Sequence, residues 1–469
     1  WSFEELGFLS RKAANVLSDA CNLKPGDRVI VILPRVPEWW LLNVACIRAG
    51  VVLIPGTTQL TAKDILHRLQ TSMAKCIITS DCLVEAVDSV AAQSPFLETK
   101  MLISTERRDG WLDFKGLFQT YGIYQECSEI VLMMVYLDGL NLMDTGLFST
   151  LCNYVTHKRY WMDLTPTDIV WNMSDTGWAK SAWSSVFAPW IQGSCVFAHS
   201  MPRFDTNIVL KTLSTFPITT FCSAPTAYRM LVLQNFASYK FKSLQHCVSA
   251  GEPINPQVME QWKEQTGLDI YEGYGQTETG MKIKPGSMGK PSPAYDVEIV
   301  DENGNVLPQG KEGDIAIRIL PQKPFCLFSQ YTGDPERTAS TRRGNFYLTG
   351  DRGIKDEDGY FWFVGRSDDV ILSSGYRIGP FEVESALIEH PAVAESAVVS
   401  SPDPIRGEVV KAFVVLAPAY NGHDPEKLAL ELQEHVRNIT APYKYPRKIE
   451  FVQQLPKTVS GKIRRNELR

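Results

Sequence analysis

The sequence predicts an α/β fold in which helices cover parallel sheets, and three observations support this. Short apolar runs such as Arg28–Leu33 and Lys75–Ser80 alternate with helix-length segments through the first half of the chain. Apolar strands separated by helices are typical of parallel sheets buried on both faces. From about residue 290, alternating strands follow one another across polar turns, as antiparallel strands do. The last hundred residues or so then form a separate β/α pattern.

The elements of the first half follow from this alternation. The chain opens at Trp1 inside an expected amphipathic helix, so we expect the natural protein to begin earlier. A helix is expected at Trp39–Ala49, after the first strand. Strands are expected at Arg28–Leu33, Val51–Ile54, Lys75–Ser80, Val196–Ala198, Ile218–Phe221 and His246–Ser249.

The second half divides into a β-rich subdomain and a C-terminal unit. Antiparallel strands are expected at Asp296–Val300, Asp314–Ile319, Tyr347–Asp351 and Tyr360–Val364. Beyond them we expect helices near Pro380–Glu389 and Pro425–Asn438 and a strand pair at Ser396–Ser400 and Lys411–Leu416. We therefore predict a large N-terminal domain over residues 1–366, β-rich from about 290, and a small mobile α+β domain over 367–469. The hinge is expected near Asp368.

Composition excludes several classes of protein. The 469 residues are 44% hydrophobic and 21% charged, and the net charge is −6 without a long run of one sign. A nucleic-acid partner would require a concentrated basic face, so we expect none. The longest apolar run, Ile130–Tyr136, is far too short to span a membrane. The ten cysteines form no CxxC pair. We expect Cys46, Cys76, Cys82, Cys195 and Cys247 to be buried free thiols.

The densest motif is Glu272–Gly280, with the sequence EGYGQTETG. Its glycines allow a close approach to a ligand, and its other residues offer an aromatic face, amides, a hydroxyl and carboxylates. Such a set can hold a purine, a phosphate and a magnesium ion. On chemistry alone, a glycine-rich turn between a strand and a helix is an equally good interpretation.

Three further motifs have polar groups suited to a nucleotide or a thiol substrate. Asp351, at an expected strand end, and Arg366 can hold a ribose and a phosphate, although an isolated pair of this kind is more often structural. The loop Ser373–Pro380 precedes a helix that Pro380 can open, or is an ordinary connection. In Pro456–Ile463, Lys462 can neutralise a developing phosphate charge, although a flexible basic tail fits the same residues.

Together these strings resemble the acyl-adenylate-forming superfamily over essentially the whole chain. Four stretches are similar to the mitochondrial medium-chain acyl-CoA synthetases in particular: Leu33–Trp40, Ser174–Trp178, Ser401–Glu408 and Ala441–Lys448. That family activates a carboxylic acid with ATP and magnesium to an acyl-AMP. Coenzyme A then displaces AMP after the C-terminal domain has rotated about its hinge.

The resemblance implies roles for individual residues. The catalytic residues would be Lys462, Thr277 and Glu278, with Glu278 also holding magnesium. Asp368 would lie at the hinge, and Thr277, Arg377 and Trp178 would contact the acid. ATP or AMP would be bound by Gly251, Glu252, Glu272, Gly273, Tyr274, Gly275, Gln276, Thr277, Asp351, Arg366 and Lys462. Coenzyme A would be bound by Gln59, Ser374, Gly375, Tyr376, Arg406 and Arg437, of which the two arginines taken alone are ordinary surface residues.

The sequence departs from the family at two places. After Ile130–Tyr136, members carry a Thr/Ser/Gly-rich loop ending in Gly-x-Pro-Lys, which cradles the ATP phosphates. Residues 137–158 here contain two glycines and two acidic residues, and no lysine comes before Lys158. Either this loop has degenerated or the recorded sequence carries a frame or splicing error. A segment that shapes the acyl pocket is also missing after Gly280.

The sequence therefore predicts an ATP-dependent ligase that joins a medium-chain or aromatic carboxylic acid to coenzyme A, with adenylation impaired. The alternative is a non-catalytic relative that binds a nucleotide, acyl-CoA or a protein. An adenylation domain serving a carrier protein ranks below both, because the positions for coenzyme A are present. A luciferase-like peroxisomal oxidase is disfavoured because the C-terminus lacks a Ser-Lys-Leu signal. By resemblance, the compartment is the mitochondrial matrix.

Overall fold

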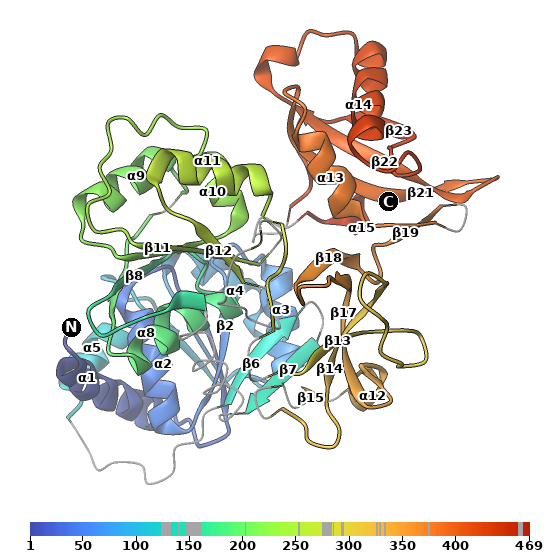
Figure 1. The fold of residues 1–469 in the computed structure, drawn as a ribbon. Helices are drawn as coiled ribbons and strands as arrows, with labels where there is room; N and C mark the ends of the chain where they lie inside the picture. Colours follow the sequence, from blue (N-terminus) through green and yellow to red (C-terminus); the bar gives the residue numbers. More distant parts are fainter. Residues whose placement is uncertain are drawn as a thin grey trace.

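The computed structural model describes the chain except residues 123–132, 139–140, 147–160, 202, 252–253, 274–283, 285, 292–294, 325–326, 328–329, 333, 374–375 and 458–462. For residues 133–138, 141–146, 179, 332 and 377 it describes the backbone alone. The strands of the described residues form four sheets (Figure 1). The predicted α/β fold is confirmed, with a mainly parallel sheet that has antiparallel strands at one edge, a wholly parallel sheet, an antiparallel sheet and a C-terminal sheet.

The first parallel sheet has helices on both faces, as the apolar strands predict. Alternate residues of β1 (Arg28–Ile32) enter opposite cores: Val29 packs with α1 and α2, whereas Ile30 packs with α3 and α4. The strands lie in the order β15-β7-β6-β2-β1-β3-β4-β5. Their bounds are β2 Val52–Gly56, β3 Cys76–Thr79, β4 Thr99–Leu102, β5 Leu112–Asp113, β6 Met133–Asp138, β7 Asn141–Gly146 and β15 Gln330–Thr332. The helices are α1 Phe3–Asn15, α2 Pro37–Ala49, α3 Ala62–Ser72, α4 Val84–Ala91 and α5 Phe114–Thr120, with short turns at Val16–Ala20 and Asp81–Leu83.

Helix α1 begins within the chain, which corrects the expectation that the chain opens inside a helix. The hydroxyl of Ser2 accepts a hydrogen bond from the Glu5 backbone N–H at 3.1 Å, and the Glu5 carboxylate accepts one from the Ser2 N–H at 2.7 Å. This reciprocal capping satisfies two amides that the first turn leaves without partners.

The second parallel sheet has the order β12-β11-β10-β8-β9, and all its strands run in the same direction. Trp262 and Tyr228 from its helices pack in the core on one face, and Trp161 packs on the other. The strands are β8 Ile169–Asn172, β9 Cys195–Phe197, β10 Thr220–Ser223, β11 His246–Ala250 and β12 Ile270–Gly273. The helices are α7 Ala179–Ala182, α8 Ala188–Ile191, α9 Thr206–Thr215, α10 Pro225–Leu231 and α11 Pro256–Thr266, with a π-helical turn at Trp183–Phe187 between α7 and α8.

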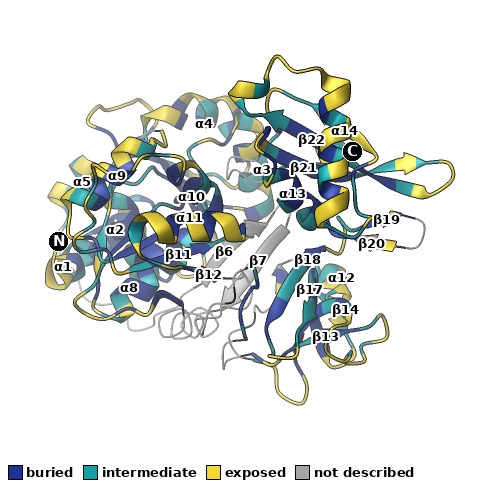
Figure 2. Ribbon diagram, turned by 45° about the horizontal axis from the view of Figure 1, so that its top comes forward, coloured by how far each residue is buried: buried dark blue, intermediate teal, exposed yellow. Residues whose placement is uncertain are grey.

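The remaining two sheets confirm the predicted change of pattern. The antiparallel sheet contains β13 Val297–Val300, β14 Glu312–Arg318, β16 Arg342–Arg343, β17 Phe346–Lys355 and β18 Phe361–Arg366, with α12 Pro335–Ser340. The C-terminal sheet contains β19 Ile371–Ser373, β20 Tyr376–Ile378, β21 Val393–Asp403, β22 Gly407–Leu416 and β23 Lys448–Phe451. Its helices are α13 Pro380–Ile388, α14 Pro425–Ile439 and α15 Arg465–Leu468, with a turn at Pro418–Tyr420. Figure 2 shows buried residues along the strands and exposed residues on the outer faces of the helices.

The cysteine prediction is correct for only part of the set. Cys46, Cys76 and Cys247 are buried free thiols, and burial raises the pKa of Cys247 to about 12. Cys82 and Cys195 are exposed, so the prediction was wrong for them. The reason is local, because Cys82 lies in a short surface turn and Cys195 begins the edge strand β9.

Candidate functional site

The first two sheets meet at the carboxyl ends of β1, β2 and β8. Arg35, just after β1, donates hydrogen bonds to the carbonyl oxygens of Met173 and Ser174, which follow β8. Thr57, just after β2, donates to the Asp175 carboxylate at 3.1 Å. Ligands of open α/β sheets bind beyond the carboxyl ends of the strands, so this junction is where a substrate site is expected.

The junction brings two predicted residues to the same place. The backbone N–H of Gln59 donates to the Thr57 hydroxyl at 3.4 Å, and the N–H of Trp178 donates to the Asp175 carbonyl at 3.0 Å. Gln59 and Trp178 therefore lie on the two sides of the Thr57–Asp175 hydrogen bond. This is consistent with a shared acyl and coenzyme A region, although the sequence analysis did not single out Thr57 or Asp175.

Gly177 allows the two sheets to approach closely at this junction. A Cβ at Gly177 would lie 2.6 Å from the carbonyl carbon of Gly56 and would also clash with the backbone N of Thr57. We expect Gly177→Ala to lower the free energy of unfolding by about 2–3 kcal/mol, because backbone atoms cannot move aside as a side chain can. Chemical denaturation measures this. The control is Gly7→Ala, whose Cβ meets nothing within 4 Å in α1 and which should not destabilise the protein. An equal loss in both variants would contradict the packing argument.

Lys180 connects two strands of the second sheet at the same edge. Its ammonium group donates to the carbonyl oxygens of Ser223 (2.8 Å) and Ala250 (3.0 Å), the last residues of β10 and β11. Lys180 was not predicted from the sequence. Its only signal was its position two residues after Trp178.

Three of the predicted nucleotide-binding residues lie side by side beyond this edge. Glu272 and Gly273 end β12, where they pair with Ser249 and Ala250 of β11, and Gly251 follows directly. Gly251 has a φ of +111°, which favours glycine. A Cβ at Gly273 would come within 2.7 Å of the Trp161 ring, so this backbone is pressed against the aromatic side chain.

The surroundings of the Glu272 carboxyl group favour its protonated form near neutral pH. Burial raises its pKa to about 8, and the hydrogen bond from the Ile254 backbone N–H (3.3 Å) only partly opposes this effect. A protonated Glu272 adds no negative charge beside a nucleotide phosphate. It can also donate a hydrogen bond, which a carboxylate cannot.

The raised pKa predicts how stability depends on pH. The folded protein keeps the Glu272 proton up to a pH of about 8, whereas the unfolded chain loses it near 4.5. The contribution of this group is therefore present below pH 4.5 and is lost as pH rises towards 8. Because the side chain is only half-buried, we expect Glu272→Gln to be about 2 kcal/mol more stable than the wild type at pH 9 and equal to it near pH 4.5. Urea denaturation at the two pH values measures the difference, and a pH-independent difference would contradict the assignment.

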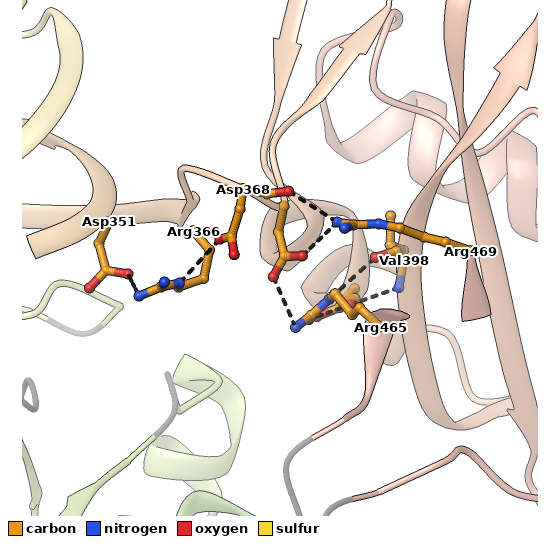
Figure 3. Close-up of polar contacts among 8 residues, drawn as sticks. Asp351, Arg366, Asp368, Val398, Arg465 and Arg469 are labelled. Atoms are coloured by element: carbon orange, nitrogen blue, oxygen red, sulfur yellow. Dashed lines mark hydrogen bonds and ion pairs between the residues drawn. The ribbon is translucent and has the colours of Figure 1, made fainter. Parts of the chain in front are cut away.

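Asp351, Arg366 and Asp368 form one connected group (Figure 3). The Arg366 guanidinium lies 3.4 Å from the Asp351 carboxylate and 3.3 Å from that of Asp368. Asp351 is buried, with its side chain 8% exposed, whereas Arg366 and Asp368 are exposed. The structure thus brings together the residues predicted for the ribose, the phosphate and the hinge.

Asp351 does not end its strand, which corrects the sequence prediction. Strand β17 continues to Lys355, but its register with β14 shifts between Leu348 and Arg352. Asp351 lies inside this bulge while still pairing with Arg366 on the other side. Bulges often turn a side chain towards a site, and this one replaces the expected strand end.

The residues predicted to bind coenzyme A are spread over the C-terminal sheet. Tyr376 begins β20, so part of the predicted loop is a strand, and its exposed ring stacks on Tyr443 at 4.2 Å. Arg437, in the last turn of α14, lies over the Tyr445 ring. Arg406 lies in the turn between β21 and β22, where its N–H donates to Asp403. No contact that the structure describes joins it to Arg437.

A basic and aromatic cluster extends the Arg437 position and was missed by the sequence analysis. The guanidinium of Arg447 lies 4.9 Å from the centre of the Tyr445 ring and donates to the Tyr445 hydroxyl at 2.9 Å. Both residues belong to the stretch Ala441–Lys448, which contributed only to the resemblance. Its alternating aromatic and basic residues were the available signal.

Several predicted residues lie outside the described part of the chain. These are Glu252, Tyr274, Gly275, Gln276, Thr277, Glu278, Ser374, Gly375 and Lys462, together with the side chain of Arg377. Among the residues that are described, no cluster of three His, Cys, Asp or Glu side chains could hold a metal ion. No helix in the described ranges is long and apolar enough to cross a membrane.

The stretch that departs from the family forms a strand pair in its described part. β7 pairs with β6 over Asn141–Gly146, and with β15 at Leu142, Met143 and Asp144. The backbone of β7 therefore lies between two antiparallel neighbours. Backbone N–H groups that donate hydrogen bonds to a neighbouring strand cannot also donate them to a phosphate group.

Comparison with known families defines the class of protein. The model of the AMP-binding enzyme family matches residues 1–121 and 144–320, and that of the AMP-binding enzyme C-terminal domain matches residues 382–462. The chain thus belongs to the class of AMP-binding enzymes. Residues 122–143, which include β6 and the start of β7, are left unmatched. The match resumes inside the stretch 137–158 in which the sequence departs from the resembling family.

Comparison with individual proteins narrows the class. The chain is 65% identical to the Rattus norvegicus "Acyl-coenzyme A synthetase ACSM3, mitochondrial", covering all of this chain and 84% of that protein. It is 60% identical to the Homo sapiens "Acyl-coenzyme A synthetase ACSM4, mitochondrial", with the same coverage. The chain belongs to the family of mitochondrial acyl-coenzyme A synthetases. The alignment with the rat protein runs over 485 positions, more than the 469 residues of the chain, so the relative has residues that this chain lacks.

Solved structures confirm the fold. The anthranilate CoA ligase AuaEII in complex with anthranoyl-AMP superposes with a TM-score of 0.90 at 29% identity, covering all of this chain and 91% of that one. A benzoate CoA ligase from Burkholderia xenovorans LB400 superposes with a TM-score of 0.88 at 25% identity, covering all of this chain and 94% of that one.

Proposed function

We propose that the protein is an acid–thiol ligase that joins a medium-chain or aromatic carboxylic acid to coenzyme A through an acyl-AMP intermediate. ATP and coenzyme A are the other substrates. The observation that carries the proposal is the connected group of Asp351, Arg366 and Asp368 in a chain of this family. A buried carboxylate beside a guanidinium offers acceptors to ribose hydroxyls and donors to a phosphate.

Each group of residues has a part in the proposed reaction. Gly251, Glu272 and Gly273 border the nucleotide, and Asp351 and Arg366 hold its ribose and phosphate. Gln59 and Trp178 line the junction reached by the acid and the thiol, and Tyr376, Arg406 and Arg437 bind coenzyme A. Lys462, Thr277 and Glu278 are proposed for adenylation on the resemblance alone. Magnesium would be held at Glu278.

We further propose that residues 1–366 and 367–469 are two domains that turn about Asp368. Strand β18 ends at Arg366 in the antiparallel sheet, and β19 begins at Ile371 in the C-terminal sheet. The connection between the two sheets is therefore short and contains the proposed hinge. The named relatives are mitochondrial proteins, which supports the mitochondrial matrix as the compartment.

Adenylation is proposed to be the impaired half-reaction. The pairing of β7 on both edges supports this, because it removes backbone donors that a triphosphate would need. Loss of one such donor typically costs roughly 10²–10³ in rate. The thiolation half-reaction uses acyl-AMP, which has no β- or γ-phosphate, and would be spared.

The proposal is tested most simply on the thiolation step. Purified protein is given presynthesised hexanoyl-AMP or benzoyl-AMP with coenzyme A, and acyl-CoA and AMP are measured by chromatography. We expect both products in equal amounts. If the folded protein forms no acyl-CoA from either adenylate, the ligase function is wrong.

A further inference from the structure

Asp368 of the proposed hinge and its neighbour Asp369 are bound by arginines from the segment that follows Lys462. The Arg469 guanidinium donates to the Asp369 carboxylate at 2.6 Å and to the backbone carbonyl of Asp368 at 3.2 Å. Arg465 reaches the other oxygen of the Asp369 carboxylate at 3.9 Å. The Asp368 side chain also pairs with Arg366. Asp368 therefore contacts Arg366 on one side and Arg469 on the other (Figure 3).

Arg465 extends this connection into the C-terminal core. It donates to both carboxylate oxygens of Glu384 in α13, at 2.7 and 2.8 Å, and to the carbonyl of Val398 in β21 at 3.3 Å. Glu384 is only 6% exposed and accepts a further bond from the Val398 N–H at 2.7 Å. Such a buried two-point pair has a fixed geometry, because breaking it would leave a charge unpaired inside the protein.

The chain on both sides of residues 458–462 is fastened to the same sheet. Lys457 and Ile463 form an antiparallel bridge, and the Arg464 N–H donates to the Pro456 carbonyl at 2.9 Å. The Lys457 ammonium pairs with Glu395 of β21 at 2.6 Å. Backbone contacts thus join the two sides of this stem, residues 456–457 and 463–465, and side-chain contacts of Lys457 and Arg465 hold it to β21 and α13.

We propose that Arg465 and Arg469 are positioning residues that tie the hinge to this stem, so that the stem turns with the hinge and not independently of it. The inference rests on the proposed function, which gives Asp368 and Lys462 their roles. Fastening α15 to its sheet would require only the pair of Arg465 with Glu384. The partners of Arg469 are instead Asp368 of the hinge and its neighbour Asp369, which a purely structural role does not explain.

Hydrogen exchange and kinetics of full-chain variants test the tie. Arg469→Gln removes the charge, Arg469→Lys keeps it, and Asp369→Asn breaks the same pair from the other side. Lys411→Gln is the matched control, because it breaks an ion pair of 2.8 Å with Glu450 elsewhere in the same sheet. Amide exchange is followed in peptides covering 366–373 and 393–403, and kcat and KM are measured for each half-reaction.

We expect Arg469→Gln and Asp369→Asn to raise exchange in 366–373 by about tenfold, as loss of a charge-assisted hydrogen bond implies. Exchange in β21 should not change, and Arg469→Lys should restore most of the protection. We expect kcat for acyl-AMP formation, where it is measurable, to fall about tenfold with KM for ATP nearly unchanged, because a displaced group misaligns the reaction.

If amide hydrogen exchange in the peptide 366–373 is unchanged in both Arg469→Gln and Asp369→Asn, the inference is wrong. An equal effect of Lys411→Gln, or a failure of Arg469→Lys to restore protection, would also overturn it. If the wild type catalyses neither half-reaction, the proposed function fails. The exchange measurements then still decide whether the tie exists.

Discussion

Replacing Asp351 by alanine is expected to lower the rate of acyl-CoA formation from acyl-AMP by about 10²–10³-fold. Asp351 is buried in the bulge of β17 and pairs with Arg366, so the change removes the proposed ribose acceptor and leaves the guanidinium without this carboxylate. Both half-reactions use the AMP moiety, and both should be affected. The measurement is the single-turnover rate with presynthesised hexanoyl-AMP and coenzyme A.

Asp358→Ala is the control for this prediction. Asp358 belongs to the turn before β18 and is largely exposed, and it pairs only at the surface with Lys284. A surface pair contributes little, so the rate should stay within about twofold of the wild type. If Asp351→Ala is folded and as fast as Asp358→Ala, Asp351 does not bind the nucleotide.

Replacing residues 137–158 with the Thr/Ser/Gly-rich loop of the resembling family, ending in Gly-x-Pro-Lys, is expected to raise pyrophosphate release by about 10²-fold or more. The graft supplies free backbone donors and a lysine where β7 now pairs with β6 and β15. The thiolation rate from acyl-AMP should not change, and it serves as the internal control. A graft that folds, thiolates normally and releases pyrophosphate no faster than the wild type would show that this stretch does not limit adenylation.

The parallel sheets could be predicted from the sequence because their strands are apolar on both faces. Val29 and Ile30 enter two different cores, so no polar residue interrupts the run. The antiparallel sheet was predictable for a different reason, because residues alternate along its strands and polar turns separate them. The strands at Val297–Val300 and Glu312–Arg318 pair as expected.

The strand β7 was not predicted, because its residues give a weak local strand signal and one of its two partners is distant in the chain. Residues 141–146 include an aspartate and a glycine, which weaken any local strand signal. The strand pairs with β15, whose residues Gln330–Thr332 lie far along the sequence. The bulge at Asp351 has the same origin, because it depends on the registers of β14 and β18 with β17.

The residue types in the sequence identified members of the candidate site, but they did not predict which of those residues contact one another. Asp351, Arg366 and Asp368 were singled out individually, and the structure adds that they contact one another. The contacts of Arg35 with Met173 and of Arg465 with Glu384 join residues 138 and 81 positions apart. No spacing rule reports such contacts, which depend on how the sheets pack.

We propose that this chain retains thiolation while its adenylation is impaired. The most direct test compares the two half-reactions on one preparation. Pyrophosphate release is measured from ATP with hexanoate or benzoate, and acyl-CoA formation is measured from the corresponding acyl-AMP with coenzyme A. We expect thiolation to proceed and pyrophosphate release to be slower by at least about 10²-fold. Equal rates for the two half-reactions would contradict the account of β7, and the absence of both from folded protein would favour a non-catalytic binding protein.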